Sequence, residues 1–423
     1  MGDREIKELQ DGEQARKSDN PLIPSSPHPP PLSSSAYRIF VSTGEVSGDL
    51  QGALLIQALR DRAEQAGIRL EIPALGGQRM AEAGAVLLAD TSAIGSIGIL
   101  ESVPYIFSTL RIQRQVKHHL RQYPPDLVVM IDYVSPNLAM GRFVRQHLPQ
   151  VPTVYYIAPQ EWVWSINNRN TNLILQITDR LLAIFLGEAE YYQKRGAKVT
   201  WVGHPLVDRM QMAPGRSQAR SMLGISAEQI AIALIPASRR QELNYILPVM
   251  FEAARQIQAQ LPQVHFWIPL SLEIYRPILE QAIRHYGLRA TLVADQSQVV
   301  IAAADLAIAK SGTVNLETAL LNVPQVVMYR LSEATAWIAR HVLKFSAPFV
   351  SPPNLVMMET IVPELLQDKA TPERITQEAL DILLNPARQQ QMLTDYQRMR
   401  QKLGDVGVCD RAAQAILQLL EKI

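Results

Sequence analysis

The order of apolar and amphipathic segments is the feature that most limits the folds open to this chain. From Tyr37 onward, short apolar runs alternate with longer amphipathic stretches. This alternation is typical of parallel sheets with helices on both faces, so the sequence predicts an α/β fold of doubly wound units. Strands are predicted at residues 38–42, 127–131, 153–157, 180–184 and 199–202, and again at 230–235, 264–269, 290–293, 306–309 and 325–329.

A proline-bearing segment at residues 203–215 separates the two groups of predicted strands, and we interpret it as a linker between domains. The predicted division is one domain of residues 37–205 and a second of residues 206–400. Residues 401–423 are apolar at helical spacing and are expected to pack back on a domain or on a second subunit, so a homodimer is possible. Two such domains usually bind ligands in the cleft between them, at the carboxyl ends of the strands.

Composition removes several classes of function. The chain has 423 residues, 47% of them hydrophobic, which is enough for about two domains and a tail. Its formal net charge of +1 gives no indication of nucleic-acid binding. A single cysteine, Cys409, excludes an intrachain disulfide framework and a cysteine-clustered metal site. The eight histidines have no ligand-type spacing, so neither a metal nor another cofactor is expected.

Residues 1–36 are predicted to be a disordered leader, because they mix charges with the proline-rich run PLIPSSPHPPPLSSS. They contain no apolar region of the kind found in a signal peptide. No uninterrupted apolar run approaches the roughly 20 residues of a membrane-spanning helix. We therefore expect a cytoplasmic protein whose membrane contact, if it has one, is peripheral.

The segment IAKSGTVNLE, residues 308–317, predicts a strand, a small turn and a helix in immediate succession. Ser311, Gly312 and Thr313 lie where the helix is expected to begin. Free backbone N–H groups and two hydroxyls at a positive helix end suit a phosphate. Glu317 follows about one helical turn later, within reach of a sugar hydroxyl near that phosphate. The alternative is an ordinary helix cap with Glu317 as a helix-forming residue.

Two further segments of the second half also have features of a ligand-binding site. In IALIPASRRQE, Ser238 and Arg239 follow a predicted strand, and the planar guanidinium of Arg239 matches phosphate oxygens. A solvated pair of arginines is the alternative, but two phosphate-compatible turns favour a diphosphate site. In FVSPPNLVMM, Asn354 lies in a proline-stiffened loop that presents its amide at a fixed angle, unless it is a plain turn residue.

The first half opens with FVSTGEVSGDLQGALL, which predicts a strand, a glycine turn and a helix. Gly44 and Gly48 permit a tight turn and the close approach of a ligand. Glu45 and Asp49 add two carboxylates that a purely structural turn would not need. These residues are candidates for substrate binding, although Asp49 would also serve as a helix cap. The pattern is not GxGxxG, so it does not favour a dinucleotide.

Asp132 lies at the carboxyl end of the apolar run LVVMI. Burial there would raise the pKa of its carboxyl group, and the position faces the predicted cleft. A general base is therefore its predicted role. The alternative is that Asp132 caps the helix that follows.

Together these segments resemble the lipid-A-disaccharide synthase family, inverting glycosyltransferases of the GT-B type, and the resemblance runs from about Tyr37 to the C-terminus. The family's GExSGD, GIxEV and GID segments are similar to GEVSGD, GILES and MID in this chain. The second match adds Glu101 to the candidate substrate residues. The third maps the proposed catalytic aspartate to Asp132. Further similar segments are APQEWVWS with Trp162 and Trp164, GHP at residues 203–205, ASRRQE ending at Glu242, SGTVNLE, the Pro353–Asn354 pair, and PELLQ at residues 363–367. Four positions depart from the usual family pattern, namely Ser135, Ser165, Ala237 and Glu359.

The resemblance implies a GT-B fold with two Rossmann-like domains facing a cleft. It implies UDP-2,3-diacylglucosamine as donor, 2,3-diacylglucosamine 1-phosphate as acceptor, and transfer to the acceptor 6-hydroxyl with release of UDP. In that mechanism, Asp132 accepts the hydroxyl proton while Arg239 and the helix ends stabilise UDP. Three of the departures, Ser135, Ser165 and Glu359, bear on the acceptor rather than on the donor.

Acylated substrates suggest a role for residues 95–122, where apolar residues precede the basic positions Arg111, Arg114, Lys117 and Arg121. We hypothesise that this segment lies on the inner-membrane surface. An ordinary helix packed against the core is the alternative. Other functions compatible with the whole pattern are a glycosyltransferase with another donor or lipid acceptor, a protein like the sugar-nucleotide epimerases, and a non-catalytic homologue.

Overall fold

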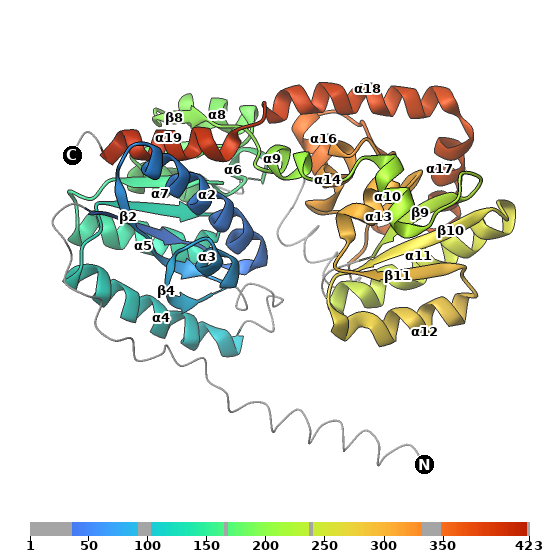
Figure 1. Ribbon diagram of the computed structural model, residues 1–423, viewed down its shortest axis with the longest axis horizontal. Helices are drawn as coiled ribbons and strands as arrows, with labels where there is room; N and C mark the ends of the chain where they lie inside the picture. The colour runs from blue at the N-terminus through green and yellow to red at the C-terminus, as the bar shows by residue number, and fades with distance from the viewer. Residues whose placement is uncertain (1–35, 92–102, 165–167, 237–239, 332–347, 421–423) are drawn as a thin grey trace, which may run out of the picture. The chain divides into compact units, whose positions relative to one another are not determined.

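A computed structural model describes residues 36–91, 103–164, 168–236, 240–331 and 348–420 (Figure 1). Its first sheet contains the strands β1 (Ala36–Ser42), β2 (Arg69–Glu71), β3 (Pro73–Gly76), β4 (Val86–Asp90), β5 (Leu127–Ile131), β6 (Thr153–Tyr156), β7 (Arg180–Ala183) and β8 (Val199–Trp201). Their order is β4-β3-β1-β5-β6-β7-β8, and β2 pairs with β1. The pairs of β1 with β3 and β5, and of β5 with β6, are parallel.

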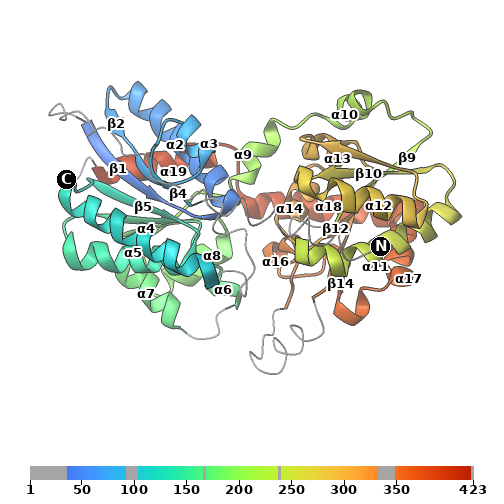
Figure 2. The same ribbon diagram turned by 90° about the horizontal axis from the view of Figure 1, so that it is seen from below.

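Helices cover both faces of this sheet, as the alternating sequence pattern predicts. In Figure 2, α2 (Glu45–Gln65) and α3 (Gln78–Glu82) lie on one face, while α4 (Val103–Gln122) and α5 (Val134–His147) lie on the other. All five residues of β5 are buried, as expected for a central parallel strand. The remaining helices of this part of the chain are α6 (Glu161–Trp164), α7 (Arg169–Ile177) and α8 (Leu186–Gln193).

The second sheet contains β9 (Ile230–Ile235), β10 (Val264–Leu270), β11 (Ala290–Ala294), β12 (Leu306–Lys310), β13 (Gln325–Tyr329) and β14 (Glu364–Leu366), in the order β11-β10-β9-β12-β13-β14. All of its pairings are parallel. The helices of this half are α9 (Leu206–Gln211), α10 (Arg216–Leu223), α11 (Arg240–Gln260), α12 (Arg276–Tyr286), α13 (Ser297–Ala303), α14 (Val314–Leu320), α16 (Pro352–Met357), α17 (Pro372–Leu384), α18 (Pro386–Leu403) and α19 (Val408–Leu420).

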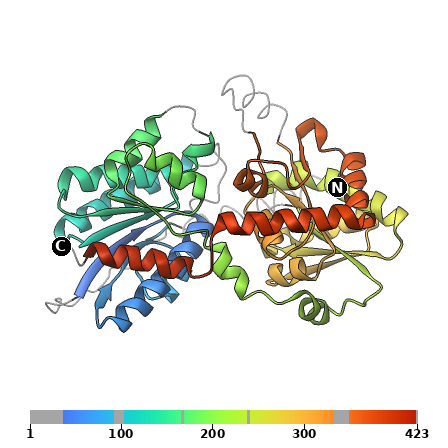
Figure 3. The same cartoon turned by 90° about the horizontal axis from the view of Figure 1, so that it is seen from above.

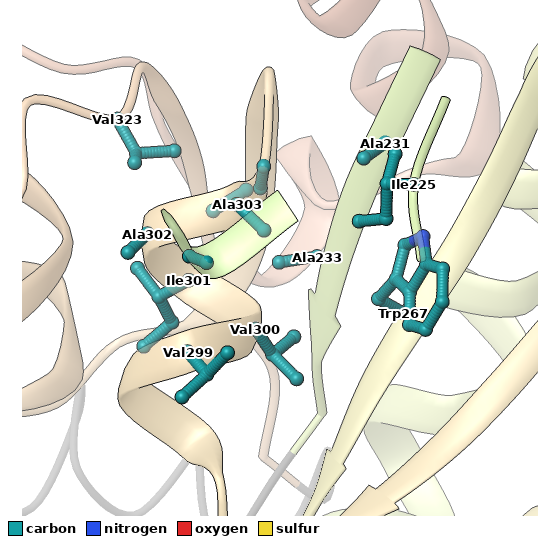
Figure 4. Close-up of a cluster of buried hydrophobic side chains, with 13 residues drawn as sticks. Ile225, Ala231, Ala233, Trp267, Val299, Val300, Ile301, Ala302, Ala303 and Val323 are labelled. Atoms are coloured by element: carbon teal, nitrogen blue, oxygen red, sulfur yellow. The ribbon is translucent and has the colours of Figure 1, made fainter. Parts of the chain in front are cut away.

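A cluster of small and branched side chains packs α13 onto the second sheet. Figure 4 shows residues of α13 beside Ala231 and Ala233 of β9 and the ring of Trp267 on β10. Alanines on the central strand let the helix approach the sheet closely, and Val300 and Ile301 fill the space with no exposed surface. This packing fixes the strands whose carboxyl ends carry the predicted nucleotide residues.

The predicted parallel α/β architecture is confirmed, and each of the ten predicted strands is present within two residues of its expected ends. Strand β6 stops one residue early because Ile157 has a left-handed backbone with φ 56°. The short strands β2, β3, β4 and β14 were not predicted, since three of them are only partly buried and none has a long apolar run. The expected linker contains a helix, α9, rather than irregular chain.

The described chain divides into two compact units. Among the described residues, one unit comprises those within 36–159, 176–181 and 412–420, and the other comprises those within 160–175 and 182–411. The helices α18 and α19, drawn in red in Figure 3, follow each other at the C-terminus, and residues 412–420 of α19 belong to the first unit. The domain boundaries expected from the sequence remain predictions.

Candidate active site

The SGT turn connects β12 to α14, as the sequence predicts, and Thr313 is the N-cap of that helix. Thr313 is exposed, and the N–H groups of Thr313 and Val314 have no intramolecular partner among the described residues. The Gly312 N–H donates to Asn315 Oδ1 at 2.8 Å, so this amide is occupied. Two free amide N–H groups at an exposed helix start can donate hydrogen bonds to a phosphate oxygen.

Ser311 fastens this turn to the loop before α16. Its hydroxyl donates to the Val350 carbonyl at 2.9 Å, and the Val350 N–H donates to Glu364 at 2.7 Å. The same Glu364 carboxylate accepts from Asn354 Nδ2 at 3.1 Å. The predicted nucleotide residues Ser311 and Asn354 therefore lie in one hydrogen-bonded arrangement.

Asn354 is completely buried, and its side chain is fully engaged with its own loop. Besides Glu364, it bonds to the backbone of Ile361 and Val362 through both amide atoms. The sequence predicted an amide presented to a ligand or a plain turn residue, whereas in the structure the side chain holds its own loop together. Its role as a nucleotide ligand stays a prediction.

A partly buried ion pair links the strand before one predicted phosphate turn to the helix after the other. Lys310, the last residue of β12, donates to Glu242 in the first turn of α11 at 2.8 and 3.1 Å. The strands that precede the two turns, β12 and β9, are neighbours, with Ala309 opposite Ile235. The predicted ligands Ser238 and Arg239, like the departure at Ala237, lie outside the described residues, but the helix that follows them begins beside Lys310.

Glu317 is paired with Arg209 of α9, since Arg209 Nη1 donates to Glu317 Oε1 at 2.9 Å. Burial raises the pKa of the Glu317 carboxyl group, and the Arg209 guanidinium acts in the opposite direction. The carboxylate lies one turn after Thr313 on α14, as predicted. Its partner lies 108 residues away, so no local sequence pattern indicates the pair.

Asp132 directly follows β5 and has a left-handed backbone with φ 46°. Burial raises the pKa of its carboxyl group, and a hydrogen bond from the Tyr133 N–H partly opposes this. The predicted rise in the pKa of Asp132 is therefore present, and its role as a general base stays a prediction. The alternative, a cap on the following helix, is wrong, because α5 begins at Val134 and its N-cap residue is Tyr133.

The glycines of the turn after β1 pack against neighbouring side chains and do not border open space. A Cβ on Gly44 would lie 2.5 Å from the Tyr133 ring, and one on Gly48 would lie 2.0 Å from Thr43 Oγ1. Asp49 accepts from the backbone N–H groups of Gly77, Arg79 and Met80 at 2.8 to 3.2 Å. It therefore caps α3, not the helix that contains it, which corrects one of the two interpretations given above.

Two other candidate substrate residues have no described side chain. Glu45 is the first residue of α2, and only its backbone belongs to the described structure. Glu101 lies outside the described residues, as does Ser165 among the departures from the family pattern. Of the other departures, Ser135 is exposed on α5, and Glu359 pairs with Arg398 at 2.6 Å.

Neither a membrane-spanning helix nor a metal-binding cluster is found in the residue ranges that the structure describes. None of their helices combines the length and apolar character needed to cross a membrane. Within the same ranges, no group of three or more His, Cys, Asp or Glu side chains is arranged to hold a metal ion.

The comparisons with known proteins agree with this architecture. The lipid-A-disaccharide synthase of Gloeothece citriformis is 59% identical over 380 residues, which are 90% of this chain and 99% of that relative. In fold, the chain is similar to a putative UDP-N-acetylglucosamine 2-epimerase from Listeria monocytogenes, with a TM-score of 0.63 and 15% identity over 92% of this chain and 98% of that one. It is also similar to WaaG, a glycosyltransferase involved in lipopolysaccharide biosynthesis, with a TM-score of 0.54 and 13% identity over 89% and 99% of the two chains.

The two structural matches show the GT-B type of fold that the sequence resemblance implied. The family model described as lipid-A-disaccharide synthetase matches residues 39–419, which is nearly the whole described chain. The protein is therefore a glycosyltransferase and belongs to the lipid-A-disaccharide synthetase family.

Proposed function

We propose that the protein transfers 2,3-diacylglucosamine from its UDP-linked form to the 6-hydroxyl of 2,3-diacylglucosamine 1-phosphate, forming a disaccharide and releasing UDP. The family membership supports the overall reaction, and one fold relative is named for a UDP-sugar substrate. The observation that carries the donor assignment is the turn at Thr313, with two unpaired amides and an acidic side chain one helical turn later. This arrangement suits a phosphate with a sugar beside it.

In this proposal, the second unit binds UDP. The diphosphate accepts hydrogen bonds from the Thr313 and Val314 amides and from Arg239, with Ser238, its neighbour in the sequence, as a further ligand. Glu317 accepts a hydrogen bond from a hydroxyl of the nucleoside sugar. Asn354 contributes to nucleotide binding indirectly, by stabilising its own loop. These groups stabilise the negative charge that develops on the leaving UDP without any change in their own positions.

Asp132 is proposed to be the general base of the first unit. It takes the proton of the acceptor hydroxyl as that oxygen attacks the anomeric carbon, so a single displacement inverts the configuration there. Gly44, Glu45, Gly48, Asp49 and Glu101 are proposed to form the substrate side of this unit, with Asp49 acting indirectly through α3. We further propose that the protein works in the cytoplasm at the inner-membrane surface, where α4 presents Arg111, Arg114 and Arg121 as exposed cations.

The proposal is tested by incubating the purified full chain with UDP-2,3-diacylglucosamine and 2,3-diacylglucosamine 1-phosphate and analysing the products by mass spectrometry. A disaccharide 1-phosphate and an equal amount of UDP are expected. Release of UDP only in the presence of a different lipid would show that this lipid is the acceptor. An isomerised UDP-sugar without transfer would indicate an epimerase, and no reaction with any of these substrates would contradict an active transferase.

A further inference from the structure

Three residues with left-handed backbones gather at the carboxyl ends of β5 and β6. Asp132 has φ 46°, Tyr133 has φ 50° and Ile157 has φ 56°, and none of them is glycine. The two strands are neighbours, with Ile131 opposite Tyr156. Such conformations are costly for bulky and branched residues, and they persist only where the surrounding structure holds them.

Asn137 on α5 makes several of the hydrogen bonds that hold these strand ends. It is completely buried. Its Nδ2 lies 2.8 Å from the Asp132 carbonyl, 3.0 Å from the Ile131 carbonyl and 3.3 Å from the Ser42 carbonyl, while its Oδ1 accepts from the Ser42 hydroxyl at 2.7 Å. One amide thus joins the ends of β1 and β5 to the start of α5.

Tyr155 on β6 holds the same carbonyl from the neighbouring strand. Its hydroxyl donates to the Asp132 carbonyl at 2.9 Å, and its ring is completely buried. The Asp132 N–H donates in turn to the Ile157 carbonyl at 3.2 Å. The backbone of Asp132 is therefore restrained at both its N–H and its carbonyl group.

The ring of Tyr133, which packs against Gly44, restrains the same stretch of backbone. It lies so near Gly44 that any Cβ there would be 2.5 Å from the ring, which limits how far residues 132 and 133 can turn back toward an ordinary conformation. Because the direction of a side chain depends on its own φ and ψ, relaxation of Asp132 would swing the carboxylate away from its present direction.

We propose that Asn137 and Tyr155 are positioning residues that hold the Asp132 backbone left-handed and thereby aim its carboxylate at the acceptor. This inference rests on the proposed role of Asp132 as the base. Neither residue contacts substrate in this account. Both donate a hydrogen bond to the Asp132 carbonyl oxygen. Weakening either of these two bonds lowers the rate of the chemical step and leaves the binding of UDP unchanged.

The test compares Tyr155→Phe and Asn137→Ala with wild type for kcat, for the Kd of UDP and for the melting temperature. Tyr155→Phe removes a single hydrogen bond and keeps the buried ring, and kcat is expected to fall about fivefold. Asn137→Ala removes several bonds and is expected to lower kcat by about 30-fold or more. The Kd of UDP should stay within about twofold of wild type in both.

Tyr192→Phe is the control for the loss of a buried tyrosine hydroxyl, because Tyr192 is also completely buried, lies in the second unit, and has a hydroxyl with no hydrogen-bond partner among the described residues. It should leave kcat unchanged. If Asn137→Ala does not fold, Tyr155→Phe still decides the question. A Tyr155→Phe rate equal to that of wild type and the control, or a loss that appears only as weaker UDP binding, would overturn the inference. Absence of product from wild type would instead overturn the proposed function.

Discussion

Arg209 and Glu317 form an ion pair of 2.9 Å between α9 and α14, so the acidic side chain predicted to bind the nucleoside sugar already has a cationic partner. Glu317 is buried, and its burial favours the protonated form. The Arg209 guanidinium opposes this rise in the pKa of Glu317 and so favours the ionised form, which accepts hydrogen bonds from hydroxyl groups. In the proposed donor site, the ion pair is therefore compatible with a hydrogen bond from a sugar hydroxyl to Glu317.

Arg209→Met should weaken UDP binding, more at pH 6 than at pH 8. Without the guanidinium, the pKa of Glu317 rises further, and the protonated form loses its capacity to accept a charge-assisted hydrogen bond. A loss of about tenfold in affinity at pH 6 is expected. Isothermal titration calorimetry at both pH values measures it. Arg276→Met, which breaks the exposed Arg276–Glu273 pair, is the control, and equal affinities for Arg209→Met and wild type would exclude Glu317 from the nucleotide site.

Lys310→Met should weaken the binding of UDP but not that of uridine. Lys310 neutralises Glu242, and its loss leaves an uncompensated carboxylate, only 11% exposed, beside the phosphate turns. Repulsion then acts on the charged diphosphate, with an expected loss of about tenfold, and hardly on a neutral nucleoside. The double variant Lys310→Met/Glu242→Gln should recover most of the affinity. Equal losses for UDP and uridine would point to general damage to the unit.

The strands were predictable because their sequences carry the information locally. Segments such as residues 127–131 and 230–235 are apolar runs with polar ends, and the structure places β5 and β9 at those residues. Strands β2 and β14 have only three residues each, so their pairing depends on neighbours rather than on their own composition. The helix starts after β1 and β12 were predictable for the same local reason, since small turn residues follow each strand.

The contacts of the site were less predictable, because they join distant segments. Asp49 caps a helix that begins 29 residues later, and Glu317 meets Arg209 from another helix. Asn137 and Tyr155 were missed, although Asn137 lies only five residues after Asp132. Lys310 could have been predicted as a site residue, because it is a single cation at the end of the apolar run LAIAK, but it was not among the predicted residues.

Asp132→Asn should abolish most of the transfer while leaving the UDP complex intact. The amide has the same size but cannot accept the hydroxyl proton, so kcat should fall by about 100-fold or more. Because burial raises the pKa of the Asp132 carboxyl group, the acid limb of the wild-type profile of kcat/KM should lie above the ordinary value of 3.8. A stopped assay across pH 4 to 8 measures both. Near-normal turnover by the variant would remove the base assignment.

Asn354→Ala should lower the free energy of unfolding by about 3 kcal/mol, because it leaves buried amide and carbonyl groups of the 350–364 loop without partners. Urea denaturation followed by circular dichroism measures the change. The exposed Asn244→Ala, on α11, is the matched control and should stay within about 0.5 kcal/mol of wild type. Unchanged stability of Asn354→Ala together with lost UDP affinity would assign the residue to the ligand instead of the loop.

His204 makes the stability of the fold depend on pH in a predictable direction. Its imidazole is buried, packs on Phe185 and accepts a hydrogen bond from the Leu206 N–H at 3.2 Å. Burial lowers the pKa of His204 to about 3, below the value of 6.5 that it has when exposed. The unfolded chain therefore binds a proton first, so the stabilisation is complete above pH 6.5 and declines as the pH falls from there toward 3.

The free energy of unfolding should consequently fall by about 2 kcal/mol from this group between pH 7.5 and pH 5. Urea titrations at the two pH values measure the fall. His204→Asn keeps a hydrogen-bond acceptor near the position of Nδ1 but does not titrate, so its pH dependence should be smaller than that of wild type by this amount. The exposed His285→Asn, on α12, should keep the wild-type dependence. An undiminished fall in His204→Asn would show that other groups cause the acid sensitivity.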